Sequence, residues 1–360
     1  MTNKNARRFA PLSAAMIAAT CLSSAVLVSA TAAMARAGGA GEVNVYSFRQ
    51  PYLIRPLLRA FTKKSGIKVN VIFAKKGLIE RAAAEGRNSP ADVLLTSDIG
   101  RLTGAVAKGI TQPVHSAVLN KQIPPAYRSA KGDWFGLTKR ARIVFASKTR
   151  VRQNKITYEQ LADPKWRGRI CVRSGQHVYN IALIASMIAH HGKAKTKAWL
   201  MALKNNLARK PSGNDRSQVK AVYAGVCDIA IGNTYYMAKM QLNDKRPVQK
   251  KWAASVKMLF PNAGGRGTHI NISGMVMAKY APHRQNAVKL MEYLASDEAQ
   301  AIYAAVNNEY PVSPAVKPSH LVQSWGALNA DPIALETIAK YRNAASQMVD
   351  EVGFNNGPSS

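Results

Sequence analysis

The sequence switches repeatedly between the two-residue period of strands and the longer period of helices. Six such segments follow one another in the first third of the chain: strands at 43–47, 67–74 and 92–97, and helices at 53–64, 78–85 and 99–108. Strands that alternate with helices in this way are typical of a parallel sheet with crossover helices. The sequence therefore predicts an α/β fold for this part of the chain.

A second alternation begins near residue 140. It predicts strands at 142–147, 169–174, 227–233, 256–260 and 270–277, and helices at 177–190, 194–207, 215–224, 234–242 and most of 284–307. A chain of 360 residues is long enough for two medium domains. We therefore expect two α/β lobes, followed by a loose tail at 355–360.

Residues 1–37 have the three-part layout of a secretory signal peptide. A short basic start is followed by a run without charge, Phe9 to Ala33, and then by Ala35-Arg36-Ala37, which suits a signal peptidase. An uncleaved membrane anchor stays open as an alternative, because the apolar run approaches the ~20 residues of a span. We expect cleavage of residues 1–37 and export of the mature chain.

The charge balance is strongly basic, with 51 Lys and Arg against 19 Asp and Glu, a formal net charge of +32. The predicted signal peptide holds four of the basic residues and no acidic one, so the mature chain keeps +28. Such a balance brings nucleic acid, anionic membranes and anionic small ligands into consideration. Export and the lack of zinc-finger spacing or an RNA-binding aromatic signature argue against nucleic acid. The basic residues are spread along the chain, which predicts a generally positive surface.

Two cysteines remain in the mature chain, Cys171 and Cys227, in segments that both resemble buried strands. In an oxidising compartment a pair of cysteines favours one disulfide. Two buried thiols are the alternative, because free cysteine is commonly buried.

Three tyrosines follow predicted strands at the point where helices begin. Tyr179 ends the segment 173–179, and Tyr235 and Tyr236 end the segment 232–236. Ligands of open α/β sheets bind beyond the carboxyl ends of strands, where loops lead into helices. Two lobes, export and the lack of a catalytic motif therefore suggest a hinged solute-binding protein that closes around its ligand at this edge.

The chemistry of three phenols points to a hard metal. Tyrosine titrates near ~10, and a helix N-terminus or a nearby cation favours the phenolate. Three phenolates supply three negative charges on hard oxygen atoms, which matches Fe³⁺ and suits a soft or divalent metal poorly. Packing or carbohydrate stacking is the alternative use of such tyrosines.

Six segments spread over nearly the whole mature chain carry a family resemblance: 45–50, 89–94, 137–142, 163–168, 173–179 and 232–236. Through them the chain resembles the periplasmic ferric-ion-binding proteins that feed bacterial iron(III) ABC importers. The paired tyrosine after a strand-end Asn is the most specific of these signals. The resemblance implies that Tyr235 and Tyr236 coordinate iron, and Tyr179 matches the third tyrosine of the subgroup with tyrosine-rich sites.

The resemblance also implies the fold and the partners. It implies a type II periplasmic solute-binding protein, in which each lobe is a mixed, mostly parallel sheet flanked by helices and the ligand lies in the cleft between the lobes. We expect lobe 1 at 41–138 and 262–312, lobe 2 at 139–261 and 313–360, and crossing strands near residues 139 and 261. The implied partner is an ABC importer permease in the inner membrane, and we expect a periplasmic monomer.

The sequence departs from the family in the first lobe. Gln50 stands where many relatives carry His, and Pro51 follows it where some carry Tyr. Ser97 occupies the place of a Glu found in other relatives, with Asp98 beside it. The first lobe therefore offers no obvious strong ligand, although Tyr52 is an alternative one. Three tyrosines leave positions of an octahedron for water, or for an anion such as carbonate or citrate.

Groups that bind anions accompany the tyrosines. Ser174 and Gly175 present backbone N–H groups at a helix start, a common anion site. Arg140 matches the arginine that relatives use near a synergistic anion, and Arg49 lies beside Gln50. Either arginine lowers a phenolate pKa by its charge, unless it is simply solvated. We expect closure to bring Arg49 and Gln50 over the metal.

Enzyme motifs are missing from the sequence, which lacks HExxH, G-x-S-x-G and a Walker A run. We therefore expect a non-enzyme that captures Fe³⁺ and delivers it to an importer. One alternative is a solute-binding protein for an organic anion, such as a phosphonate or polycarboxylate, held by Ser174, Gly175 and the arginines. Another is an envelope sensor that does not transport.

Overall fold

The structure is a computed structural model that describes residues 41–358. Residues 40–360 form one compact unit, which is described here by itself. The predicted signal peptide, 1–37, lies outside the described residues. Within the described range, no helix combines the length and the hydropathy that a membrane span needs.

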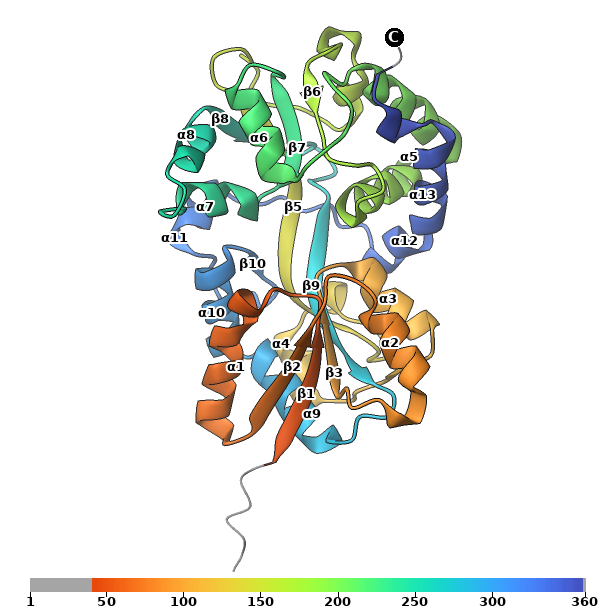
Figure 1. Ribbon diagram of the computed structural model, residues 1–360, viewed down its shortest axis with the longest axis vertical. Helices are drawn as coiled ribbons and strands as arrows, with labels where there is room; N and C mark the ends of the chain where they lie inside the picture. Colours follow the sequence, from red (N-terminus) through yellow and green to blue (C-terminus); the bar gives the residue numbers. More distant parts are fainter. Residues whose placement is uncertain (1–40, 359–360) are drawn as a thin grey trace, which may run out of the picture. The chain divides into compact units, whose positions relative to one another are not determined.

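A mixed sheet of ten strands runs through the described unit, and its main path has the order β2-β1-β3-β9-β5-β7-β6 (Figure 1). The strands are β1 (Glu42–Ser47), β2 (Lys68–Phe73), β3 (Val93–Thr96), β4 (Thr111–Gln112), β5 (Phe135–Ser147), β6 (Ile170–Cys171), β7 (Ile229–Asn233), β8 (Val256–Leu259), β9 (Ile270–Ala278) and β10 (Tyr310–Pro311).

Helices cover the sheet on both sides (Figure 1). Those in the described residues are α1 (Pro51–Ser65), α2 (Leu78–Glu85), α3 (Ile99–Ala107), α4 (Ala117–Gln122), α5 (Val178–Asn205), α6 (Asp215–Tyr223), α7 (Tyr235–Gln241), α8 (Val248–Ala254), α9 (Arg284–Ala295), α10 (Asp297–Asn307), α11 (His320–Gln323), α12 (Leu335–Lys340) and α13 (Arg342–Glu351).

The first strands and helices form as the sequence predicts. β1 pairs in parallel with both β2 and β3, and α1 and α2 make the crossovers. Helix α1 buries Leu53, Leu57 and Phe61, which recur at helical spacing, and ends at Gly66. Gly66 has φ 72°, a left-handed conformation that glycine adopts without the steric cost of a Cβ atom.

Strands β5 and β9 pass through both halves of the unit (Figure 1). The first part of β5, to Ala141, pairs with β9, and its last part, from Arg142, pairs with β7 and β8. Three strand pairs are parallel, β1–β2, β1–β3 and β6–β7, and the other pairs in the described residues are antiparallel. The sheet is mixed, as expected, but the expectation that most of its strand pairs would be parallel is wrong. The cause is that β5 and β9 are buried along nearly their whole length, and such strands read alike in either direction.

One local expectation is confirmed and another needs correction. The helices expected at 177–190 and 194–207 are the two parts of α5, which are separated by a kink at the non-helical Gly192, where φ is 78° and ψ is 166°. The tail is not loose up to Pro358, because Phe354 is buried and the Asn355 side chain accepts a hydrogen bond from the Gly175 N–H. Single side chains anchor the tail, and they produce no helix or strand periodicity in the sequence from which the anchoring could be predicted.

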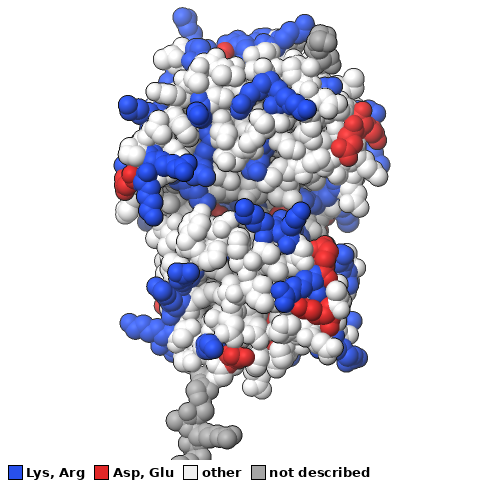
Figure 2. All heavy atoms as spheres, in the orientation of Figure 1, with Lys and Arg blue, Asp and Glu red and all other residues white. Residues whose placement is uncertain are grey.

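The disulfide and the positive surface are both as predicted. Cys171 at the end of β6 and Cys227 before β7 are joined in a buried disulfide, with their Cα atoms 5.9 Å apart. Figure 2 shows Lys and Arg side chains scattered over both halves of the visible face, with few Asp and Glu side chains between them.

Candidate metal centre

The paired tyrosines are held in place by the end of strand β7. All five residues of β7 are buried, and α7 begins two residues after the strand ends at Asn233. The Asn233 N–H donates to Asp215 Oδ2 at 2.9 Å, and its side-chain oxygen accepts from Arg142 at 3.0 Å. This network fixes the turn that presents Tyr235 and Tyr236.

The third tyrosine comes from the first turn of α5. The Tyr235 hydroxyl donates to the Tyr179 hydroxyl at 2.9 Å, and the rings of Tyr235 and Tyr236 lie 4.5 Å apart between centroids. All three side chains line one cavity of about 260 Å³. The structure therefore brings together the three tyrosines that the sequence singled out.

Burial controls the acidity of two of these phenols. Burial, followed by the neighbouring Tyr179 and Tyr236, raises the pKa of Tyr235 well above its ordinary value. Burial and Asp215 raise the pKa of Tyr236 to about 12, although Arg173 works in the opposite direction. The expected lowering of the phenol pKa by nearby arginines is thus outweighed in these two residues, which are protonated at neutral pH.

Three arginines surround the ring of Tyr179. The guanidinium carbons of Arg140, Arg142 and Arg173 lie 5.8, 5.8 and 5.3 Å from its centroid. Arg142 and Arg173 both pair with the buried Asp215, at 2.8 and 3.1 Å. One carboxylate thus serves two guanidinium groups, which leaves this side of the cavity with excess positive charge.

Arg140 links the tyrosines to the first half of the sheet. Its side chain is 2% exposed, donates to the Ser97 carbonyl, and donates to Ser273 Oγ at 3.3 Å. Ser97 itself lines the cavity. Arg140 is therefore a buried, bonded group and not a solvated one.

The opposite wall of the cavity contains Arg49, Gln50, Tyr52 and Glu309. Arg49 Nη1 donates to Glu309 Oε1 and to Ser273 Oγ, both at 2.9 Å, and Thr138 also donates to Glu309. Burial alone would raise the pKa of Glu309, but Arg49 and Arg140 hold it below its ordinary value. Arg49 Nε and Nη2 are buried without a hydrogen-bond partner in the described chain.

Comparison with known proteins identifies the class. Residues 88–325 match the bacterial extracellular solute-binding protein family. The chain belongs to this family. It is 44% identical over 315 residues to iron uptake protein A1 of Synechocystis sp., and this match covers 87% of each of the two chains.

Two solved structures resemble this family member closely. The apo ferric ion-binding protein A of Pasteurella haemolytica is 52% identical, with a TM-score of 0.83 over 87% of this chain and 98% of that one. The Trichodesmium protein IdiA (FutA) was solved in complex with iron and citrate ligands. It is 44% identical, with a TM-score of 0.83, and the match covers 87% of this chain and 100% of that chain. The family resemblance found in the sequence and the type II solute-binding fold are confirmed.

Two of the anion-binding residues expected in this solute-binding protein lie elsewhere. Ser174 and Gly175 do not line the cavity. The Gly175 N–H donates to Asn355 Oδ1 at 2.8 Å, and a Cβ on Gly175 would meet Phe354 and Val349 at 2.8 Å. An anion at this loop would have to displace Asn355.

Lys239 and Glu309 are cavity residues that the sequence analysis missed. Lys239 Nζ lies 3.5 Å from the Tyr52 hydroxyl and 4.9 Å from the Tyr235 ring centroid. Burial and Arg49 lower its pKa to about 8. Its position four residues after Tyr235, on the same helix face, is the signal that would have indicated it. Glu309 has no comparable signal, because it reaches the cavity through tertiary packing.

The phenols are the metal-binding candidates of the described residues. No group of three or more His, Cys, Asp or Glu side chains is placed there to hold a metal ion. The cavity instead offers three phenol oxygens on one wall and cationic donors around it.

Proposed function

We propose that this protein captures Fe³⁺ outside the inner membrane and delivers it to an ABC importer permease. The observation that carries the proposal is the convergence of Tyr179, Tyr235 and Tyr236 on one cavity, with two hydroxyls 2.9 Å apart. Iron uptake protein A1 and the ferric ion-binding protein A, at 44% and 52% identity, support the same assignment.

Tyr179, Tyr235 and Tyr236 bind the ion as phenolates. The buried Tyr235 and Tyr236 are protonated in the free protein, so binding exchanges their protons for the metal charge. Three phenolates neutralise a trivalent ion, and hard oxygen donors favour it over softer metals.

The remaining coordination positions belong to an anion such as carbonate or citrate. Arg49 has two buried donor nitrogens without partners, and Lys239 lines the same cavity. Arg49 and Lys239 line a cavity of about 260 Å³, which is large enough for a metal ion together with a small anion. The relative IdiA (FutA), solved with iron and citrate, supports this assignment.

Closure of two lobes around the ion completes the function. We assign lobe 1 to 41–138 and 262–312, and lobe 2 to 139–261 and 313–360. In this assignment β5 and β9 form the hinge, and Arg49 and Gln50 face the tyrosines across the cleft. The mature protein acts in the periplasm as a monomer, after cleavage of residues 1–37.

A visible absorption titration tests the proposal. The metal-stripped mature protein is titrated with ferric citrate, and a phenolate-to-Fe³⁺ charge-transfer band should colour it orange to red. The band should weaken strongly in Tyr235→Phe and Tyr236→Phe. Tyr223→Phe is the matched control, because Tyr223 is 47% exposed on α6 and does not line the cavity.

An outcome without colour under any anion, in protein that melts cooperatively, would overturn the proposal. Binding of a phosphonate or a polycarboxylate that persists in both Tyr→Phe variants would then support the organic-anion function. That function rests on the unpaired Arg49 donors and Lys239, and it makes no use of the phenols.

A further inference from the structure

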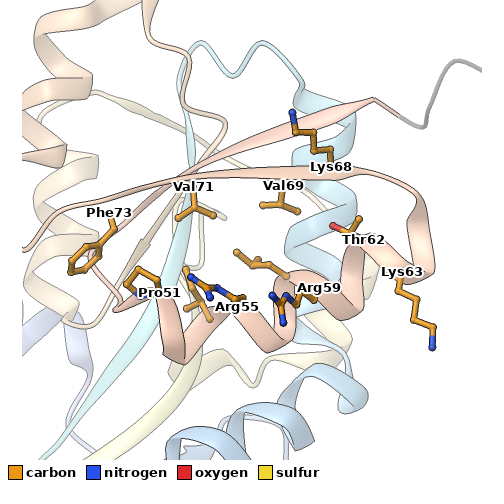
Figure 3. A pocket seen from close by; sticks show the side chains of 11 residues that line it. Pro51, Arg55, Arg59, Thr62, Lys63, Lys68, Val69, Val71 and Phe73 are labelled. Atoms are coloured by element: carbon orange, nitrogen blue, oxygen red, sulfur yellow. The ribbon is translucent and has the colours of Figure 1, made fainter.

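A second and larger hollow lies between helix α1 and strand β2, with a volume of about 730 Å³. We call it the α1–β2 groove. Its apolar floor includes Leu58 of α1 and Val69 and Val71 of β2. Figure 3 shows Val69 and Val71 pointing from β2 towards α1, which runs along the strand.

Strand β2 is an open edge of the sheet. It is the first strand in the sheet order and pairs with β1 alone in the described part of the chain. Val71 and Ile72, on opposite faces of β2, are each 38% exposed. Open edges with exposed β-branched residues attract further strands, and proteins usually block them with charges or cover them. Nothing on β2 from Val69 to Phe73 is charged.

The wall of the groove is basic. Arg55, Arg59 and Lys63 follow one another at every fourth position of α1 and are all exposed, and Lys68 stands at the start of β2. No acidic side chain is among the described residues that line the groove. Figure 3 shows Arg55 and Arg59 lying along it, with Lys63 and Lys68 pointing outward at its far end.

The spacing of this wall matches a strand. Four helical residues rise about 6 Å, and two strand residues rise about 6.7 Å. A strand added to the free edge of β2 would therefore place every second side chain opposite one of Arg55, Arg59 and Lys63. Carboxylates at those positions would meet the basic side chains, and the alternate apolar side chains would lie on the other face, beside Ile72.

We propose that the α1–β2 groove binds an extended segment of a partner protein, in which acidic and apolar residues alternate, as an added strand on β2. Main-chain hydrogen bonds to β2 supply affinity in this mode, and side-chain pairs supply specificity. A second copy of this chain is the poorer occupant, because its own edge carries the same basic wall on a protein of formal net charge +32.

The test uses a fluorescent peptide of four Glu-Val repeats, blocked at both ends, with the intact mature protein. We expect binding that weakens as salt is added, and slower hydrogen exchange of the β2 amides in the complex. Two control peptides should bind at least about tenfold more weakly: a Lys-Val repeat, which reverses the charge, and a Glu-Val repeat N-methylated at alternate residues, which cannot pair as a strand.

Two triple variants distinguish binding at the groove from attraction by the overall positive charge of the protein. The triple change Arg55→Glu, Arg59→Glu and Lys63→Glu should weaken peptide binding at least about tenfold. The triple change Lys193→Glu, Lys195→Glu and Lys251→Glu alters three exposed lysines elsewhere by the same charge and should not. The ferric absorption band and the melting temperature check that both proteins are folded.

Several results would overturn the proposal. One is equal binding by the two triple variants, and another is no binding at peptide concentrations up to about 1 mM. Binding to phosphatidylglycerol vesicles that Val71→Asp abolishes, without peptide binding, would assign the groove to a membrane surface. A concentration-dependent dimer that Val71→Asp dissolves would assign it to a second copy.

Discussion

The two walls of the cavity differ in how their charges are balanced. The wall formed by α5 and α7 presents three phenols, of which the buried Tyr235 and Tyr236 are neutral, and arginines surround the ring of Tyr179. The wall formed by Arg49 and Glu309 carries full charges that already neutralise one another at 2.9 Å. The tyrosine wall therefore gains a counter-charge only when a cation arrives, whereas the charges of Arg49 and Glu309 are paired before it.

This difference suggests a division of labour. Burial keeps the phenols of Tyr235 and Tyr236 neutral without a metal, so the site avoids two unpaired negative charges. The buried Arg49–Glu309 pair fixes one nitrogen of the guanidinium group and leaves two other donor nitrogens of Arg49 without a partner in the described chain. We therefore expect the tyrosine wall to determine whether a metal binds, and the opposite wall to determine which anion accompanies the metal.

The largest effect should come from the tyrosine wall. We expect Tyr236→Phe to weaken Fe³⁺ binding roughly a thousandfold, because one of three anionic oxygen donors is lost. Gln50→Ala, on the opposite wall, should weaken it less than about tenfold. Competition against a chelator of known affinity measures both values, and comparable losses in the two variants would contradict the division between the walls.

The opposite wall should instead respond in stability. Glu309→Gln leaves the buried Arg49 without a charged partner, so we expect the free energy of unfolding to fall by about 3 kcal/mol. Denaturant unfolding of the metal-free protein measures this change. Glu298→Gln is the control, because its ion pair with Lys64 is exposed and its loss should leave stability nearly unchanged. Equal effects of both changes would show that the buried pair is not structurally important.

The two walls should also differ in their response to pH. The pKa of Tyr236 is raised to about 12 and that of Tyr235 is also raised, so both must lose protons when Fe³⁺ binds at neutral pH. Affinity should therefore fall as pH falls, by about tenfold per pH unit for each of these protons. Glu309, whose pKa is lowered, stays charged over this range.

Proton release can be counted directly. A weakly buffered ferric citrate titration with a pH indicator should show about two more protons released by the native protein than by the double variant Tyr235→Phe/Tyr236→Phe. The same release from both proteins would mean that these phenols do not bind iron as phenolates.

A small effect, of opposite sign for the two forms of iron, should come from Lys239, which lies between the walls. Removing its charge by Lys239→Met should strengthen binding of Fe³⁺ without a chelating anion by about tenfold, because a neighbouring positive charge is lost. The same change should weaken binding of ferric citrate, whose carboxylates the amino group would contact. Calorimetry with each form of iron distinguishes the two effects, and a change in the same direction for both would exclude Lys239 from anion binding.

The sequence predicted the fold, the three tyrosines of one cavity wall and, through the family resemblance, Arg49 and Gln50 of the other. Tyr179, Tyr235 and Tyr236 stand where strands give way to helices, so local periodicity was enough to place them at one edge. Arg140 was expected through a family motif, and it lies 5.8 Å from the centroid of the Tyr179 ring without lining the cavity. Glu309 and Asp215 were not, because each meets its arginine partner only after segments far apart in the chain come together. The Ser174–Gly175 loop shows the converse error, since its local pattern gave no sign that Asn355 lies against it.

The order of the strands has a consequence for when the protein can fold. Val93 in β3 pairs with Met277 in β9, and Gly175 is held by Asn355. The first half of the sheet therefore cannot close until β9 has been synthesised, and the loop at Gly175 lacks its partner until the C-terminal residues are present. Pairings between such distant segments form slowly. A chain whose first half cannot close before β9 is made stays partly unfolded for most of its synthesis. The topology that shapes the cavity therefore also favours passage through a narrow membrane channel before folding.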